Sequence, residues 1–164
     1  MAKFSIKETH AKMAEARGQI EVKSAQIDTL KQKKDKLLEA RTTLEGVASI
    51  DEETKEMLRE ALSSQIEQTE SEAETVSDEI SESTRTLEDG MQETQEAESD
   101  TARMKSDMEQ RAAFLESIGV HGVLDGAKAK LEADLQGIEE LKAEIIDARK
   151  KGEDAQRVAS SVKN

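Results

Sequence analysis

Apolar side chains recur every seven residues in three separate runs along the chain. Such heptad spacing is typical of the seam of a left-handed coiled coil, the line of side chains that faces neighbouring helices. The first run predicts a helix over residues 5–46. Its two columns of seam positions are Ile6, Met13, Ile20, Ile27, Lys34, Arg41 and Ala48, and Thr9, Ala16, Lys23, Leu30, Leu37 and Leu44.

The second run predicts a helix over residues 51–117. One column reads Ile66, Ala73, Ile80, Leu87, Thr94, Thr101, Met108 and Leu115, and the other reads Leu62, Thr69, Val76, Ser83, Gly90, Ala97, Met104, Arg111 and Ile118. Asp89-Gly90 is an internal helix-breaking signal, but the heptad phase is the same on both sides of it. We therefore expect a continuous helix, and the alternative is a break at Gly90 that would give four helices.

The third run begins after a glycine-rich stretch, Gly119–Gly126, which predicts a turn, as Gly46 does between the first two helices. Its spacing predicts a helix over residues 124–150, with seam positions at Leu124, Leu131, Ile138 and Ile145 and at Ala127, Leu141 and Ala148. Beyond Gly152 the apolar residues are only Ala and Val. Residues 152–164 are therefore predicted to be a weakly ordered tail.

These lengths predict an all-α fold, an elongated antiparallel coiled coil of three long helices that forms one domain over residues 1–164. Short connections make successive helices antiparallel neighbours. Each outer helix would fold back along one half of the middle helix, and the far ends of the outer helices would meet near Gly90.

The composition favours a narrow apolar seam and argues against a compact globular core. The chain of 164 residues has no Pro, Cys, Trp or Tyr and only two Phe, and 37% of its residues are charged. A compact globular core normally relies on aromatic area, which is nearly absent here. High charge with few aromatic residues is also typical of disorder, but the heptad periodicity favours helices.

Charge argues against several classes of partner. The net charge is −13, and residues 49–118 alone carry 21 Asp and Glu against 6 Lys and Arg. A nucleic-acid-binding protein needs a basic surface, and so does a protein that binds an anionic membrane. No apolar run approaches the roughly 18 residues that span a bilayer, and the first residues lack the apolar core of a signal peptide. We expect a cytoplasmic protein, or one exported without a cleaved signal peptide.

Catalytic and metal-binding motifs are not found in the sequence. His10 and His121 are far apart, and neither has a His or carboxylate at the spacing of a zinc site. Close acidic pairs such as Glu70 and Glu74 would need a cleft that separates their pKa values, which a coiled coil does not offer. We therefore expect no enzymatic activity, no cofactor, no metal and no small-molecule substrate.

The glycine-rich turn carries one family resemblance. Aliphatic residues flank Val120-His121-Gly122 within a predicted hairpin of residues 100–150. This segment resembles the Trp-x-Gly helical-hairpin family of type VII secretion substrates and their partners, although the tryptophan and a Tyr-based export signal are absent. The resemblance implies a partner that is a larger secreted effector or toxin.

The sequence therefore predicts a non-catalytic coiled-coil interaction protein, an adaptor or partner subunit. The third helix has a wider apolar stripe than one antiparallel neighbour covers, which favours docking of a partner helix or homodimerisation. An acidic decoy that mimics nucleic acid and a structural homo-oligomeric spacer are the alternatives. The candidate partner-binding residues are Phe114, Val120, His121, Leu135, Ile138 and Ile146.

Overall fold

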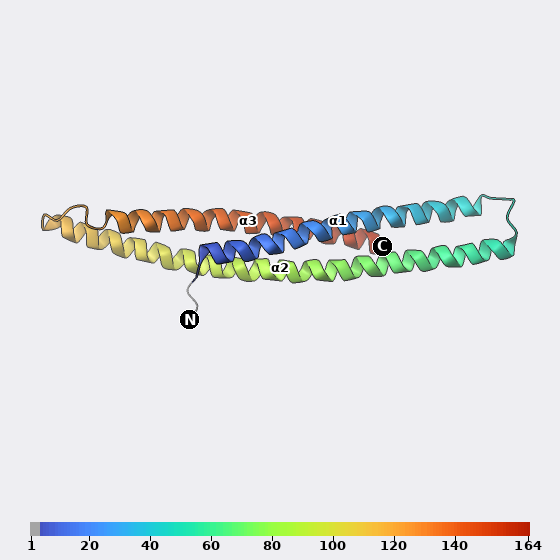
Figure 1. Cartoon of the computed structure of the whole chain (residues 1–164), viewed down its shortest axis with the longest axis horizontal. Coiled ribbons are helices and arrows are strands. Elements are labelled where there is room, and N and C mark those ends of the chain that lie inside the picture. Colours follow the sequence, from blue (N-terminus) through green and yellow to red (C-terminus); the bar gives the residue numbers. More distant parts are fainter. Residues whose placement is uncertain (1–3) are drawn as a thin grey trace. The chain divides into compact units, whose positions relative to one another are not determined.

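The computed structural model describes residues 4–164, and these residues form three α-helices and no strand (Figure 1). The helices are α1 (Ile6–Glu45), α2 (Glu52–Ser117) and α3 (Asp125–Lys163). The predicted all-α class with three long helices is confirmed. Helix α2 continues through Gly90, so the alternative with four helices is wrong.

The helix ends are fixed by local hydrogen bonds that the sequence supplies. Ser5 precedes α1, and its Oγ accepts a hydrogen bond from the backbone N–H of Glu8 at 3.2 Å, which satisfies one of the free N–H groups of the first turn. At the end of α2, Gly119 has a φ of 85° and the backbone N–H of Val120 donates to the carbonyl of Leu115 at 2.9 Å. This is a Schellman motif, in which glycine adopts the left-handed conformation without steric cost.

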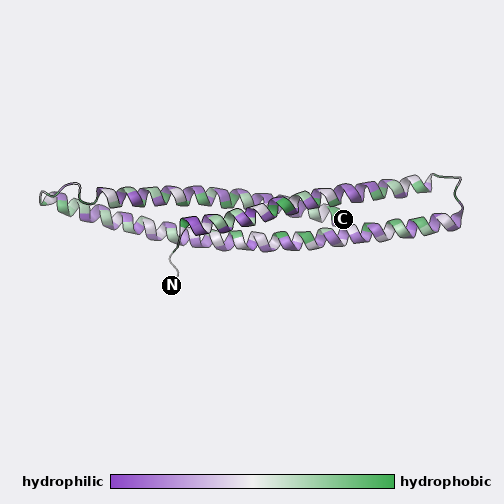
Figure 2. Cartoon of the chain, in the orientation of Figure 1, coloured by the Kyte–Doolittle hydropathy of each residue, from purple (hydrophilic) through white to green (hydrophobic). Residues whose placement is uncertain are grey.

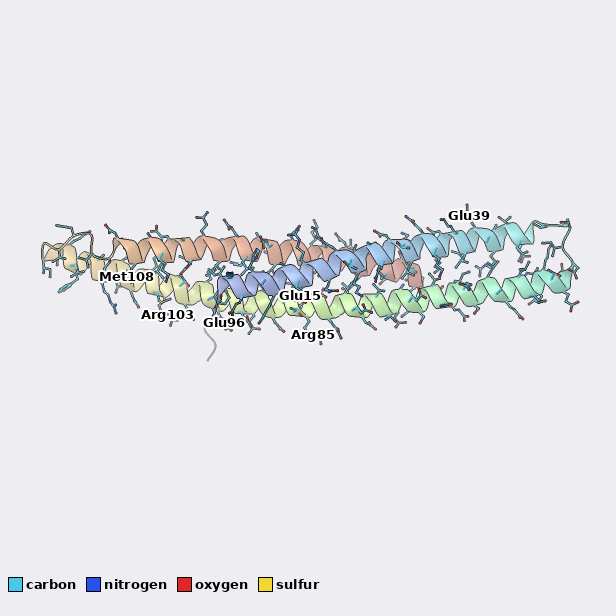
Figure 3. The ribbon with its side chains drawn as sticks, in the orientation of Figure 1. Glu15, Glu39, Arg85, Glu96, Arg103 and Met108 are labelled. Atoms are coloured by element: carbon cyan, nitrogen blue, oxygen red, sulfur yellow. The ribbon has the colours of Figure 1, made fainter. Side chains whose placement is uncertain are left out.

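The contacts of the chain gather in two compact units. Unit 1 comprises the residues up to Arg17 together with Arg85–Ala148, and unit 2 comprises Gly18–Thr84 together with Arg149–Asn164. Each unit therefore contains a part of all three helices. Exposed charged side chains such as Glu15, Glu39, Arg85 and Glu96 cover the outer faces (Figure 3).

Unit 1 packs the beginning of α1 against α2 and α3. Met13 lies so close to Gly90 that a Cβ on this glycine would be 2.3 Å from the Met13 Sδ atom. The Oγ of Thr94 donates to the Gly90 carbonyl at 2.6 Å, which pairs a hydroxyl buried at this crossing. The small residue at position 90 thus allows α1 to approach α2 closely.

The other buried side chains of unit 1 lie along all three helices, and all of them except Met91 occupy predicted seam positions. They are Thr9, Ala16, Leu87, Met91, Ala97, Thr101, Ile138, Leu141, Ile145 and Ala148.

Unit 2 has a continuous apolar core formed by all three helices. Its members are Ile27, Ala73, Val76, Ile80, Ala155, Ala159 and Val162, with Leu30 and Val158 packed against them. Gly152 allows the close approach of α3 here, because a Cβ at this position would lie 2.9 Å from Thr84 Oγ1 and 3.4 Å from Ile20 Cδ1.

One lysine of the seam is buried in unit 2. Lys34 is 7% exposed, and its Nζ lies 3.1 Å from Glu70 Oε1 and donates a hydrogen bond to the backbone carbonyl of Val162. This carbonyl belongs to the last turn of α3, where carbonyl groups lack helical partners and a positive charge is favourable. The charge of Lys34 is therefore paired in the core, and the lysine also stabilises the end of α3.

Two expectations about the outer helices are wrong. Helix α3 does not stop at residue 150 but continues to Lys163, because Ala155, Ala159 and Val162 are large enough to fill the narrow space between α1 and α2. The ends of α1 and α3 also do not meet end to end. In unit 1 the beginning of α1 lies beside the first half of α3, because the Ile6 side chain lies close to the Gly137 position.

Candidate protein-docking site

The seam of unit 1 opens to solvent near the connection between α2 and α3. We call residues 104–134 the hairpin tip. From Leu87 to Thr101 the seam positions of α2 are buried, but Met104 is 51% exposed and Ile118 is 59% exposed. Met108, which lies on α2 within the hairpin tip (Figure 3), is half-buried. The heptad column of Met104 and Ile118 therefore changes from core to surface although, apart from Arg111, it stays apolar.

The number of helices that cover the seam explains this change. Ile6 is the first residue of α1, and its side chain lies beside Gly137 of α3, 3.5 Å from where a Cβ would be. Lys105 Nζ lies 3.7 Å from Glu132 Oε1, so α2 and α3 are side by side in the hairpin tip. Among residues 4–164, no third helix of unit 1 reaches this pair. Two helices alone leave part of the apolar surface of each exposed.

Apolar side chains are concentrated at the hairpin tip. The large exposed ones are Met104, Phe114, Ile118, Val120 and Val123, with exposed fractions of 38–66%. Figure 2 shows apolar residues along α2 and α3 as far as their connection. Clustered exposed apolar residues are typical of surfaces that bind another protein, whereas scattered ones are normal on any surface.

A shallow groove of about 430 Å³ lies between α2 and α3 within the hairpin tip. Each of the two helices contributes both apolar and charged side chains to its lining. The lining residues are Met104, Asp107, Met108, Arg111, Ala127, Lys130, Leu131 and Asp134. The groove therefore combines apolar and charged side chains, as surfaces that bind another protein do.

The backbone holds the end of the hairpin tip in a defined conformation. The Schellman motif at Gly119 brings Val120 back towards Leu115, and Gly122 has a second positive φ of 77°. Asp125 begins α3, where a carboxylate is favourable beside the free N–H groups of a helix N-terminus. Two glycines and one acid thus place Val120 and Val123 on the surface.

The candidate residues predicted from the sequence are divided between surface and core. Phe114, Val120 and His121 are exposed, and all three lie in the hairpin tip. Leu135 is half-buried at the edge of the hairpin tip.

Two further candidates lie along α3 beyond the hairpin tip. Ile138 is 1% exposed, so it belongs to the intramolecular seam and is not available to a partner. Ile146 is 58% exposed but lies outside the hairpin tip.

Several residues of this surface were missed by sequence reasoning. Met104 and Ile118 occupy seam positions, and the heptad pattern predicts burial there. Val123 lies in the glycine-rich turn, where the sequence gives no register. The available signal was the length of α1, since a helix that begins at Ile6 leaves the far half of the hairpin uncovered.

The charged residues that accompany the apolar stripe of α3 have partners within unit 1. Lys142 Nζ lies 2.9 Å from Glu98 Oε2, and this hydrogen bond lowers the pKa of Glu98 and raises the pKa of Lys142. His10 Nε2 lies 2.8 Å from Glu144 Oε2 between α1 and α3. These pairs join helices of the same unit and do not form part of the hairpin tip.

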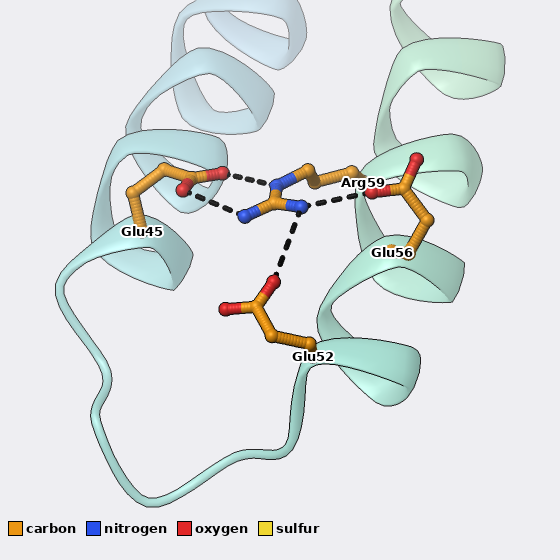
Figure 4. Close-up of polar contacts among 4 residues, drawn as sticks. All are labelled: Glu45, Glu52, Glu56 and Arg59. Carbon is orange, nitrogen blue, oxygen red and sulfur yellow. Dashed lines mark hydrogen bonds and ion pairs between the residues drawn. The ribbon is translucent and has the colours of Figure 1, made fainter.

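The connection between α1 and α2 in unit 2 has a cluster of charges beside the exposed apolar side chains of Met57 and Leu58. Arg59 makes two hydrogen bonds to Glu45, at 2.5 and 2.9 Å, and one to Glu56 at 2.8 Å, with Glu52 at 3.9 Å (Figure 4). The hydrogen bonds from Arg59 lower the pKa of Glu45, and those to Glu45 and Glu56 raise the pKa of Arg59. This turn therefore closes on itself through one bidentate pair.

A second groove, of about 710 Å³, runs between α1 and α2 in unit 2. Val22 and Leu30 lie on one wall and Val76 on the other, with small side chains such as Ala25 and Ser71 between them. Its residues include the partly buried edge of the unit 2 core. The groove is wide and open, and only Val22 among its large apolar side chains is strongly exposed.

Within residues 4–164, no group of three His, Cys, Asp or Glu side chains is arranged to hold a metal ion. In the same part of the chain, none of the helices is both long and apolar enough to cross a membrane. No protein-family model, curated protein or solved structure matches this chain.

Proposed function

We propose that this chain is a non-catalytic coiled-coil interaction protein, and that its hairpin tip is the surface that docks a helical partner. The observation that carries this proposal is the opening of the unit 1 seam. Ile138 is 1% exposed and Ile118 is 59% exposed, although both occupy seam positions. A partner helix that packs across the hairpin tip would cover Ile118 and the other exposed apolar side chains there, as α1 covers the seam in the rest of unit 1.

The physical basis of such docking is the burial of apolar surface by helix packing. Each fully buried Leu, Ile, Val, Phe or Met side chain stabilises a complex by roughly 1.5–3 kcal/mol before the costs of association. Phe114 and Ile118 stand one helical turn apart and provide two anchors at the spacing of one helix face. An amphipathic partner helix with apolar residues at matching intervals is the partner that this surface fits.

The resemblance of residues 100–150 to the Trp-x-Gly hairpin family supports a more specific form of the proposal. In this form the chain is an adaptor or helper that binds the helical region of a larger secreted effector. The residues that carry the resemblance, Val120-His121-Gly122, lie in the connection of the hairpin tip and are exposed. Their exposure is compatible with a role in partner contact.

Photocrosslinking tests the proposal with a matched control. A photoreactive amino acid replaces Phe114 in one variant and Met57 in another, because these side chains are 65% and 67% exposed and lie near the two different turns. In extracts of the native source, we expect a crosslinked protein from position 114 and none from position 57. The captured protein is then purified for a binding measurement.

The purified partner must lose affinity for the Ile118→Asp variant and keep its affinity for Met57→Asp. Both substitutions place a charge at an exposed apolar position, so neither is expected to unfold the chain. Equal loss of binding for the two variants, or equal capture at positions 114 and 57, would show that the hairpin tip is not the docking surface.

A further inference from the structure

The charges on the walls of the hairpin-tip groove follow a specific order. The α2 wall carries Asp107 and Arg111, and the α3 wall carries Lys130 and Asp134. Arg111 and Lys130 are the members of each pair that lie nearer to the α2–α3 connection. The groove therefore has a basic end towards the connection and an acidic end away from it, on both walls.

This order is complementary to itself. Two copies of the groove placed face to face and related by a two-fold axis have antiparallel helices. The basic end of one copy then lies against the acidic end of the other, so Asp107 faces Arg111 of the second copy. Lys130 faces Asp134 of the second copy in the same way. Each contact occurs twice, as a two-fold interface requires.

Within the part of the chain that the structure describes, these four charges have no partners. Among residues 4–164, no ion pair or hydrogen bond engages Asp107, Arg111, Lys130 or Asp134, although the neighbouring Lys105 is paired with Glu132. Asp107, Arg111 and Lys130 are exposed and Asp134 is half-buried. The charges are therefore available to an approaching surface without the loss of an existing contact.

Two copies of the chain repel each other less at the hairpin tip than along the first part of α2. Residues 104–134 carry six Asp and Glu and four Lys and Arg, whereas residues 51–99 carry 17 and three. Juxtaposed like charges oppose association, so two copies would not pair through the acidic first part of α2. The exposed apolar side chains and the nearly balanced charge coincide in the hairpin tip.

We propose that the hairpin tip binds the hairpin tip of a second copy of this chain, with the helices of the two copies antiparallel. Four helices then surround a shared apolar centre, which includes Met104 and Met108 of both copies. This is the packing that a pair of helical hairpins reaches in a four-helix bundle. The inference rests on the proposed function, because it names the partner of the same docking surface.

Charge-swap complementation in analytical ultracentrifugation tests this pairing. The full chain at micromolar concentration is expected to sediment as a dimer. In the Asp107→Arg variant both charges on the α2 wall are positive, and in the Arg111→Glu variant both are negative, so two copies of either variant bring like charges together. Each variant alone is expected to dimerise more weakly by a factor on the order of ten or more. An equimolar mixture of the two variants is expected to recover the dimer, because the remaining charges are opposite.

Circular dichroism of both variants controls for folding, and Glu93→Arg, an exposed substitution on α2 outside the hairpin tip, controls for net charge. A wild-type chain that stays monomeric overturns the inference, and so does a dimer that neither variant weakens. A mixture that stays as weak as its components overturns it as well. If the chain is monomeric but position 114 still captures a foreign helical protein, the proposed function stands and only the second copy as its partner is excluded.

Discussion

Met13 of α1 fills the space above Gly90 of α2, where a Cβ would lie 2.3 Å from its Sδ atom and 2.5 Å from its Cε atom. Met13 is itself 4% exposed, and the atoms in the way are the end of its flexible side chain, which must move before a Cβ can fit. Gly90 therefore lies in a continuous helix and also at the closest approach of two helices. Helix propensity and packing make opposite predictions for this position.

Gly90→Ala is expected to stabilise the chain less than helix propensity predicts, because the end of the Met13 side chain must move aside. Propensity alone predicts a gain of roughly 1 kcal/mol, and the displacement of the Met13 side chain offsets part of it. In a Met13→Ala background the obstruction is absent, and the same substitution is expected to show the full gain. The measurement is a double-mutant cycle by urea denaturation. Additive effects of the two substitutions would show that Met13 does not occupy this space.

Fully buried and half-buried seam positions are expected to contribute differently to the free energy of unfolding. Ile80 is fully buried in the three-helix core of unit 2, and Ile80→Ala should cost about 2–5 kcal/mol in the free energy of unfolding. Leu37 also occupies a seam position but is half-buried, so Leu37→Ala should cost roughly half as much. Chemical denaturation of both variants checks this order, and equal losses would contradict the difference in burial.

The heptad pattern predicted the three helices and most of the seam, because the spacing of apolar residues depends only on the geometry of one helix. It predicted Ile20, Ile80 and Ile145 as core, and all three are fully buried. It could not predict that Ile118 is exposed, because burial there depends on whether a third helix lies alongside.

The remaining errors have a related cause. Residues Ala155, Ala159 and Val162 indicate a weak helix when the sequence is considered alone, since small side chains bury little area. Their burial depends on the close approach of three helices at Gly152, which is a tertiary property. The partner-binding role predicted for Ile138 was wrong for the same reason, because a wide apolar stripe on α3 is covered by α1 as well as by α2.

The pair formed by Arg59 and Glu45 is expected to make stability depend on pH in acid. The hydrogen bonds from Arg59 hold the pKa of Glu45 below its ordinary value of 4.5. Because the folded pKa is lowered, this contribution is fully present above the unfolded pKa and is lost as the pH falls through the folded pKa. Glu45→Gln should therefore lower the melting temperature near pH 7 and have no effect in strong acid.

Thermal melts of Glu45→Gln across the acid range check this dependence, with Glu39→Gln as an exposed substitution on the same helix. The side chains of the Arg59 cluster are largely exposed, so the change is expected to be small. A difference between Glu45→Gln and the parent chain that persists unchanged in strong acid would contradict the assignment.

The opening of the seam at the hairpin tip can be measured directly because the chain contains no cysteine. Single variants Ile118→Cys, Ile138→Cys and Met57→Cys each carry one thiol, and the rate of maleimide labelling reports its exposure. At nanomolar concentration the thiols at positions 118 and 57 should react at similar rates. The thiol at position 138 should react on the order of a hundredfold more slowly. Labelling at position 118 that is as slow as at position 138 in this dilute protein would contradict the account.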